Sequence, residues 1–133
     1  MLTLAHVCLL VAALLPIVCA GIAKAGMFGR PPSKGGYDNA DPRAWLARQT
    51  GYRARANAAQ ANSFEALPLF VAAVLVAHQT QARQGLVDVL AVAFVLLRIG
   101  YIAAYVADRN VLRSLVWFAA LLVCVALLFS SKL

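Results

Sequence analysis

The chain has 133 residues, of which 63% are hydrophobic and only 13% are charged. Because soluble domains are about half apolar, this composition excludes an ordinary soluble protein and indicates one small membrane domain, residues 1–133. The formal net charge is +7. A chain this apolar leaves no soluble basic face, so we expect no nucleic-acid partner.

Four apolar stretches are each long enough to cross a bilayer as a helix. We predict spans at residues 2–24, 54–78, 86–106 and 111–129. The first stretch is longer than the apolar part of a typical signal peptide and has no basic start, so we interpret it as a retained transmembrane helix. The predicted fold class is therefore all-α, an integral membrane four-helix bundle.

The loop between the first two spans is rich in helix-breaking residues. Glycines and prolines cluster between Gly26 and Gly36, and we expect them to break any helix there. The other two connections, residues 79–85 and 107–110, are short polar turns.

The distribution of basic residues predicts the orientation of the chain. An even number of spans places both termini on one side of the membrane, where few basic residues occur. The first loop and third connection lie on the other side and carry Arg30, Lys34, Arg43, Arg48, Arg53, Arg55, Arg109 and Arg113. Since cytoplasmic loops carry an excess of lysine and arginine, we expect the first and third loops to be cytoplasmic.

The second span begins with polar and ionisable side chains. Asn62 and Glu65 are three residues apart, and Arg55 lies seven residues before Asn62, so all three share one helical face. An ionised carboxylate at the bilayer centre costs roughly ~2.5–3.5 kcal/mol on insertion scales. Such a group indicates a functional site and needs a partner.

The third span carries a second polar set. Arg98, Tyr101 and Tyr105 lie on one helical face because their spacings are three, four and seven residues. A guanidinium inside a span needs an anion, which is either Glu65 or the carboxylate of a ligand. Arginine suits both, because its planar fork binds carboxylates through two hydrogen bonds.

Arg113 and Ser114 begin the fourth span. They have a plain interpretation, in which Ser114 caps the helix and Arg113 binds lipid headgroups. Together with the other two sets, they indicate a ligand with two carboxylates, an ammonium group and a thiol, a pattern that glutathione has. Arg113 and Ser114 would then stabilise the thiolate and lower the pKa of the thiol, while an apolar electrophile arrives from the lipid.

The chain resembles the MAPEG family, the membrane-associated proteins of eicosanoid and glutathione metabolism, over essentially its whole length. The stretch from Arg55 to Phe70, with Asn62, Glu65 and Pro68, resembles the family's second-helix signature. The third-helix set from Arg98 to Tyr105 also resembles the family. The pair Arg113-Ser114 resembles the start of the fourth helix in the microsomal prostaglandin synthase branch.

The resemblance implies a homotrimer with glutathione bound as co-substrate between neighbouring subunits, and no metal. Asn62 and Glu65 would hold its polar backbone and amino end, and Arg113 with Ser114 would activate the thiol. The remaining pocket residues would be Arg55, Gln60, Arg98, Tyr101 and Tyr105. The implied activity is that of a glutathione-dependent transferase or peroxidase acting on lipophilic electrophiles.

Two features of the sequence qualify this resemblance. Ala58 stands where the family's eicosanoid enzymes carry an arginine, so one contact to a glutathione carboxylate is missing or moved. The sequence is more similar to the small bacterial branch, which implies a bacterial inner membrane and contact with its lipids.

Two other functions remain open at this point. A non-catalytic membrane scaffold or lipid-binding protein would use Glu65 and Arg98 only to lock helices together. A small multidrug-type transporter is the third alternative, but its cationic drugs would be repelled by Arg98. The cysteines Cys8, Cys19 and Cys124 form no CxxC motif or Cys/His cluster, so we expect small core side chains and no metal site.

Overall fold

The computed structural model describes residues 1–133 and confirms the predicted all-α fold. The long helices are α1 (Leu4–Lys24), α3 (Gly51–Gln79), α4 (Gln84–Val106) and α5 (Asn110–Leu128). Each of the four is long and apolar enough to cross a membrane. A short helix, α2 (Pro42–Ala47), and two 3₁₀ turns, η1 (Pro32–Lys34) and η2 (Ser130–Lys132), complete the structure. Helix α3 begins three residues before the predicted span, so its whole polar motif is helical.

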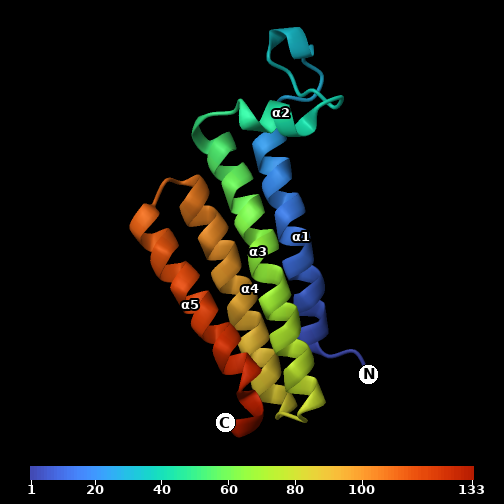
Figure 1. Cartoon of the computed structure of the whole chain (residues 1–133), viewed down its shortest axis with the longest axis vertical. Coiled ribbons are helices and arrows are strands. Elements are labelled where there is room, and N and C mark those ends of the chain that lie inside the picture. The colour runs from blue at the N-terminus through green and yellow to red at the C-terminus, as the bar shows by residue number, and fades with distance from the viewer.

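The four long helices run side by side, alternately up and down (Figure 1). Both termini lie at one end of the bundle, and the first loop with α2 lies at the other. Helix α1 packs against α3 and α4, and α5 packs against α4 and α3. Helices α3, α4 and α5 therefore enclose a groove on the side of the bundle away from α1.

The core is built mainly from small side chains and one aromatic pair. The rings of Phe70 on α3 and Phe94 on α4 stack with their centroids 4.0 Å apart. Alanines surround this pair on α1, α3 and α4, including Ala12, Ala73 and Ala91. Because small residues let membrane helices approach closely, van der Waals contact can hold the bundle together. The three cysteines are buried and free, as side chains of this packing.

The first loop contains a short helix, α2, at the loop end of the bundle. Helix α2 begins where the carboxylate of Asp41 accepts a hydrogen bond from the Ala44 amide at 3.1 Å, with Pro42 in the first helical position. Trp45 of α2 is buried and meets the ring of Tyr37 edge to face, with centroids 5.3 Å apart. Between Gly26 and Gly36, where we expected the glycines and prolines to break any helix, the structure has only the single 3₁₀ turn η1, and α2 lies beyond that stretch, where no helix was predicted.

Asp88 of α4 forms a hydrogen bond with the beginning of α1, at the end of the bundle where both termini lie. Its carboxylate accepts a hydrogen bond from the Ala5 amide at 2.8 Å and another from the Gln84 side chain at 2.9 Å. Next to it, the rings of His6 on α1 and His78 on α3 stack with centroids 4.6 Å apart. Since the first amides of a helix lack partners within it, Asp88 acts as a cap supplied by another helix.

We expect Asp88→Ala to lower the free energy of unfolding by about 1–2 kcal/mol, because it removes a cap and leaves the Ala5 amide without its acceptor. Asp88→Asn keeps an acceptor oxygen and loses only the attraction between the charge and the helix dipole, about 0.3–1 kcal/mol. Unfolding of both variants in mixed micelles with increasing denaturing detergent measures the two losses. Equal losses would contradict the capping role.

Candidate functional site

Two adjoining pockets lie between α3, α4 and α5, and they share the side chains of Asn62 and Trp117. The first, which we call the polar pocket, has a volume of about 240 Å³ and is lined by Asn62, Tyr101, Tyr105, Arg113, Ser114 and Trp117. The second, which we call the apolar pocket, has a volume of about 160 Å³. Its lining residues are Asn62, Glu65, Ala66, Leu69, Phe94, Arg98, Trp117, Ala120, Leu121 and Cys124.

A tight turn between α4 and α5 brings the residues of the polar pocket together. Helix α4 ends at Val106 and α5 begins at Asn110, with Asp108 in the turn at a φ of 60°. The chain therefore reverses within a few residues and places Arg113, in the first turn of α5, against the last turns of α4. The guanidinium of Arg113 lies 4.5 Å from the ring centroid of Tyr105.

Cations and aromatic rings alternate along this wall of the groove. Tyr105 meets Tyr101 edge to face, with centroids 5.6 Å apart, and the guanidinium of Arg98 lies 4.3 Å from the ring centroid of Tyr101. A cation over a ring face is attracted by the ring's quadrupole, which holds both arginines in place without neutralising them. The wall therefore keeps a positive potential facing the groove.

Arg98 is buried, with 2% of its surface exposed, and is held by neutral groups of α3. Its Nη2 donates to the amide oxygen of Asn62 at 3.0 Å and to the hydroxyl of Ser63 at 3.3 Å. Asn62 in turn donates from Nδ2 to the carboxylate of Glu65 at 3.2 Å. Glu65 and Arg98 are therefore connected through Asn62. Glu65 was one of the two anions predicted for Arg98, but the two side chains form no direct ion pair within the chain.

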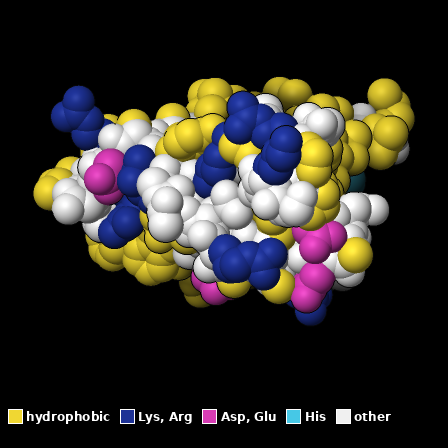
Figure 2. All heavy atoms as spheres, turned by 90° about the horizontal axis from the view of Figure 1, so that it is seen from above, with side chains coloured by type: hydrophobic (Ala, Val, Ile, Leu, Met, Phe, Trp, Pro, Cys, Tyr) yellow, Lys and Arg dark blue, Asp and Glu magenta, His cyan; other side chains and the backbone are white.

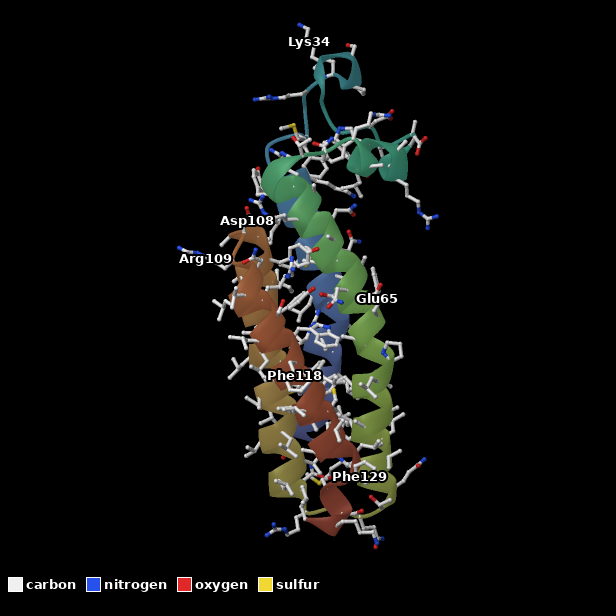
Figure 3. All side chains as sticks on the ribbon, turned by 60° about the vertical axis from the view of Figure 1, so that its left-hand side comes forward. Lys34, Glu65, Asp108, Arg109, Phe118 and Phe129 are labelled. Atoms are coloured by element: carbon white, nitrogen blue, oxygen red, sulfur yellow. The ribbon has the colours of Figure 1, made fainter.

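The single ion pair of the chain involves other residues, so Arg98 and Arg113 have no carboxylate in direct contact. Glu65 is exposed on α3 (Figure 3) and lines the apolar pocket. The buried guanidinium of Arg98 therefore has no anion in direct contact, and the exposed carboxylate of Glu65 is joined to it only through Asn62.

Ser114 lies inside α5 and does not cap it. Its hydroxyl donates to the carbonyl oxygen of Asn110 at 3.1 Å, four residues back along the helix. This contradicts the plain interpretation of Ser114 as a helix cap. Ser114 lines the polar pocket, and its hydroxyl is held only by this local bond, so it can turn toward a ligand by rotation about one side-chain bond.

Arg55 lies outside both pockets, although it shares the helical face of Asn62. Its Nε donates to the carbonyl oxygen of Val106 at 3.0 Å, and its Nη1 is 3.8 Å from the carboxylate of Asp108. A cation at the carboxyl end of a helix is favourable because unpaired carbonyls point there. Arg55 therefore ties α3 to the turn that places Arg113.

The structure places Gln60 on another side of α3. It lines a shallow groove with residues of α2, among them Arg43 and Leu46, and its buried Oε1 has no hydrogen-bond partner. Two residues of a helix that are two positions apart point roughly 200° away from each other. Gln60 and Asn62 therefore cannot line the same pocket of one subunit.

Trp117, which lines both pockets, was not among the residues predicted from the sequence. It lies four residues after Arg113, so the two side chains share a face of α5. This spacing would have indicated Trp117 once Arg113 was chosen as a site residue.

Comparison with known proteins connects this arrangement to one family. A sequence model of the MAPEG family matches residues 4–132, which include all four long helices and both pockets. No curated protein and no solved structure matches the chain. Since the match covers nearly the whole chain and four helices are apolar enough to cross a bilayer, the chain is an integral, multi-pass membrane protein that belongs to the MAPEG family.

Proposed function

We propose that this protein is a glutathione-dependent membrane transferase or peroxidase that acts on lipophilic electrophiles. Membership of the MAPEG family supports a glutathione-related function at the membrane in general. The observation that carries the finer proposal is the polar pocket, where Arg113 and Ser114 converge with Asn62, Tyr101 and Tyr105. Three helices contribute to this one space, and its only cation is a guanidinium without a carboxylate partner.

In this proposal, glutathione binds along the edge that the two pockets share. Glu65 accepts its ammonium group, and the amide of Asn62 binds its peptide backbone. Arg98 donates a hydrogen bond to the side chain of Asn62 and so fixes the position of its amide. The positive charge of Arg98 also attracts a carboxylate of glutathione. Tyr101 and Tyr105 line the wall toward which the thiol points.

Arg113 activates the thiol, with help from Ser114. A cationic neighbour and the amino end of a helix both stabilise a thiolate, and they lower the pKa of a bound thiol below its usual ~8.5. Ser114 turns from the Asn110 carbonyl to donate to the sulfur. The thiolate attacks an electrophilic carbon, the C–S bond forms, and the leaving group departs with its electron pair.

A peroxidase cycle uses the same thiolate. The sulfur attacks the terminal oxygen of a hydroperoxide, the O–O bond breaks, and an alcohol is released. A second glutathione then converts the sulfenic acid to the disulfide with loss of water. Neither reaction requires a metal.

We further propose that the protein is a homotrimer. Helix α3 carries a stripe of residues at alternating spacings of four and three: Ala54, Ala58, Ala61, Glu65, Pro68 and Ala72. From Ala61 onward the residues of this stripe are exposed. Such spacing is typical of helices that pack on one another, and small side chains allow close approach. Because a carboxylate facing lipid is costly, Glu65 favours a neighbouring subunit over lipid. In such an assembly, Gln60 reaches the glutathione of a neighbour.

The proposed orientation places the first loop and the α4–α5 turn in the cytoplasm and both termini on the opposite side. Lysine and arginine side chains gather at the loop end of the bundle (Figure 2), which the positive-inside rule assigns to the cytoplasm. The polar pocket then lies near the cytoplasmic surface, where glutathione is available. We propose the bacterial inner membrane as the location, with its lipids as the surrounding partners.

Ultraviolet difference absorbance tests the proposal directly. Mixing detergent-purified protein with millimolar glutathione is expected to give a thiolate band near ~240 nm. Arg113→Ala should remove the band, whereas Arg109→Ala, which removes an exposed arginine from the neighbouring turn, should leave it. No band in the unsubstituted protein would overturn the proposal.

A non-catalytic scaffold is the second candidate, favoured by the chain of hydrogen bonds from Arg98 through Asn62 to Glu65. Such a chain can lock membrane helices together without binding a ligand. The two candidates differ in whether these residues affect glutathione affinity as well as stability.

A further inference from the structure

The turn between α4 and α5 determines where Arg113 lies. No residue in the first half of α5 is buried, and Arg109, which precedes the helix, supplies no side-chain cap. The position of Arg113 therefore depends on the turn and on its contact with Tyr105, whose ring centroid is 4.5 Å from the guanidinium. Because a displacement of about 1 Å can lower a catalysed rate by about 100-fold, the groups that hold this turn affect the chemistry.

Helix α4 ends in a left-handed turn of the kind that usually contains glycine. Asp108 follows the helix with a φ of 60°, and its amide donates to the carbonyl oxygen of Tyr105 at 3.1 Å. The next amide, that of Arg109, donates to the carbonyl oxygen of Ala104 at 2.8 Å. These two hydrogen bonds are those of a Schellman motif. An aspartate adopts this backbone conformation less readily than glycine does, so the turn gains from a contact that supports it.

Arg55 of α3 supports this turn from outside. The carbonyl oxygen of Val106 accepts no backbone hydrogen bond, and Nε of Arg55 donates to it at 3.0 Å. Nη1 of the same guanidinium lies 3.8 Å from the carboxylate of Asp108. That carboxylate is largely exposed, so the ion pair contributes little, whereas a hydrogen bond from a cation to an end carbonyl of a helix is stabilising. Arg55 therefore acts as a cap for α4 that another helix supplies.

We propose that Arg55 is a positioning residue, which fixes Arg113 for thiol activation by holding the α4–α5 turn and makes no contact with glutathione. This inference rests on the proposed function, and it gives Arg55 a different role from the one that the family resemblance implies. Arg55 lines neither pocket, and its guanidinium is already engaged by Val106 and Asp108. Its effect on the thiol therefore passes through the turn.

Arg55→Ala separates positioning from binding. Without the cap, the first turn of α5 can shift, and we expect kcat/KM at neutral pH to fall by about tenfold or more. The rising limb of the pH profile of kcat/KM should move to higher pH, because a displaced guanidinium stabilises the thiolate less. The Kd of S-methylglutathione, which has no thiol proton, should stay the same in a calorimetric titration. A raised Kd with an unmoved limb would make Arg55 a glutathione ligand and overturn the inference.

Arg53 provides a matched control on the same helix. Its Nη1 donates to the carbonyl oxygen of Ala23 at 2.7 Å, so it caps the end of α1 in the way that Arg55 caps the end of α4. Arg53→Ala removes an arginine of the same charge and leaves the α4–α5 turn intact, so it should leave the pH profile in place. An equal shift in both variants would show a general effect of charge and would overturn the inference.

A substitution within the turn tests the route of the effect. Asp108→Gly makes the left-handed conformation easier to adopt, because glycine has no Cβ. In the Arg55→Ala protein it should move the rising limb back toward lower pH, since the turn then needs less support. A lost contact with glutathione could not be restored in this way. If Asp108→Gly restores nothing in a folded Arg55→Ala protein, the inference is overturned.

Fluorine NMR reports on the contact between Arg113 and Tyr105 without glutathione, so that this inference and the proposed function can fail separately. The chain has four tyrosines, and a Tyr105→Phe protein identifies the fluorotyrosine resonance of Tyr105. We expect Arg55→Ala to move this resonance toward its position in Arg113→Ala, and Arg53→Ala to leave it unchanged. In the Arg113→Ala background, Arg55→Ala should move it much less, because the contact is already lost.

The resonance and the thiolate band together decide the outcome. A resonance that does not move in Arg55→Ala overturns the inference, even where the protein is active. A resonance that moves in a protein without any thiolate band supports the positioning of Arg113 by Arg55, while the proposed function fails. If Arg55→Ala does not fold, Arg55→Lys takes its place. It keeps the charge and loses the planar set of donors, so the same changes should appear to a smaller extent.

Discussion

Arg98→Ala is expected to reduce both the stability of the bundle and its affinity for glutathione. The substitution removes two hydrogen bonds to α3 and leaves the amide of Asn62 and the hydroxyl of Ser63 without their donor. Hydrogen bonds to charged groups contribute about 1.5–3 kcal/mol in soluble proteins, and polar contacts between membrane helices average about 0.6 kcal/mol. We therefore expect a loss of about 2 kcal/mol in unfolding free energy, together with a glutathione Kd at least about tenfold higher.

Denaturing-detergent titration and calorimetric titration with glutathione measure the two effects. Ser63→Ala is the control, because it removes one of the two acceptors and leaves the guanidinium in place. It should cost about 0.6 kcal/mol of stability and leave glutathione affinity nearly unchanged. A stability loss in Arg98→Ala without any loss of affinity would favour the scaffold.

Double-mutant cycles sharpen this distinction. Since Asn62 stands between Arg98 and Glu65, we expect a larger coupling free energy for Arg98 with Asn62 than for Arg98 with Glu65. Glu65→Gln should weaken glutathione binding because it removes the acceptor of the ammonium group. Strong coupling of Arg98 with Glu65, with unchanged affinity in both single variants, would indicate a direct ion pair across subunits and a structural role.

Arg113→Ala is expected to lower kcat/KM by about 100-fold at neutral pH, an effect typical of losing one group that stabilises charge in a reaction. Arg113 favours the thiolate, so its removal raises the pKa of the bound thiol toward about 8.5. Less thiolate is then present at pH 7, and activity should recover as the pH rises through the new pKa. The rising limb of the pH profile of kcat/KM therefore shifts to higher pH.

Arg109, in the turn that precedes α5, offers a control of the same charge. It is exposed, and its side chain points away from the bundle in Figure 3. Arg109→Ala should leave the pH profile in place. Ser114→Ala should lower the rate by a smaller factor, because its hydroxyl supplies a hydrogen bond and no charge. If Arg113→Ala raises KM but leaves the rising limb of the pH profile of kcat/KM in place, Arg113 serves only to bind glutathione and does not activate the thiol.

Much of the fold was predictable because long apolar runs and short polar turns leave few alternatives in a membrane. Helix α2 was not predicted, although Asp41-Pro42 is a recognised signal for a helix beginning, because six residues are too few to show a helical repeat of apolar positions. The role of Asp88 depends on the amide of Ala5, 83 positions away in the chain. No local pattern connects two such residues.

The site was predictable only in part, because local patterns do not show which residues of different helices come into contact. Helical spacing correctly indicates that Arg98, Tyr101 and Tyr105 share a face, and all three lie along one wall of the groove. Spacing within one helix does not indicate which residues of the other helices pack against that face. It did not indicate that Asn62 would come between Arg98 and Glu65. Gln60 was assigned to the pocket only through the family resemblance, and the structure places it on another side of α3.

Helix α5 is held unevenly along its length. Its fully buried residues, Ala120, Cys124 and Leu127, all lie in its second half, whereas the half that carries Arg113 and Trp117 has none. The first half is therefore held to the bundle by the contact of the Arg113 guanidinium with the Tyr105 ring and by the short connection from α4. Few buried apolar contacts mean a low local stability, so hydrogen exchange in α5 should be fastest in this half and slowest around Ala120, Cys124 and Leu127.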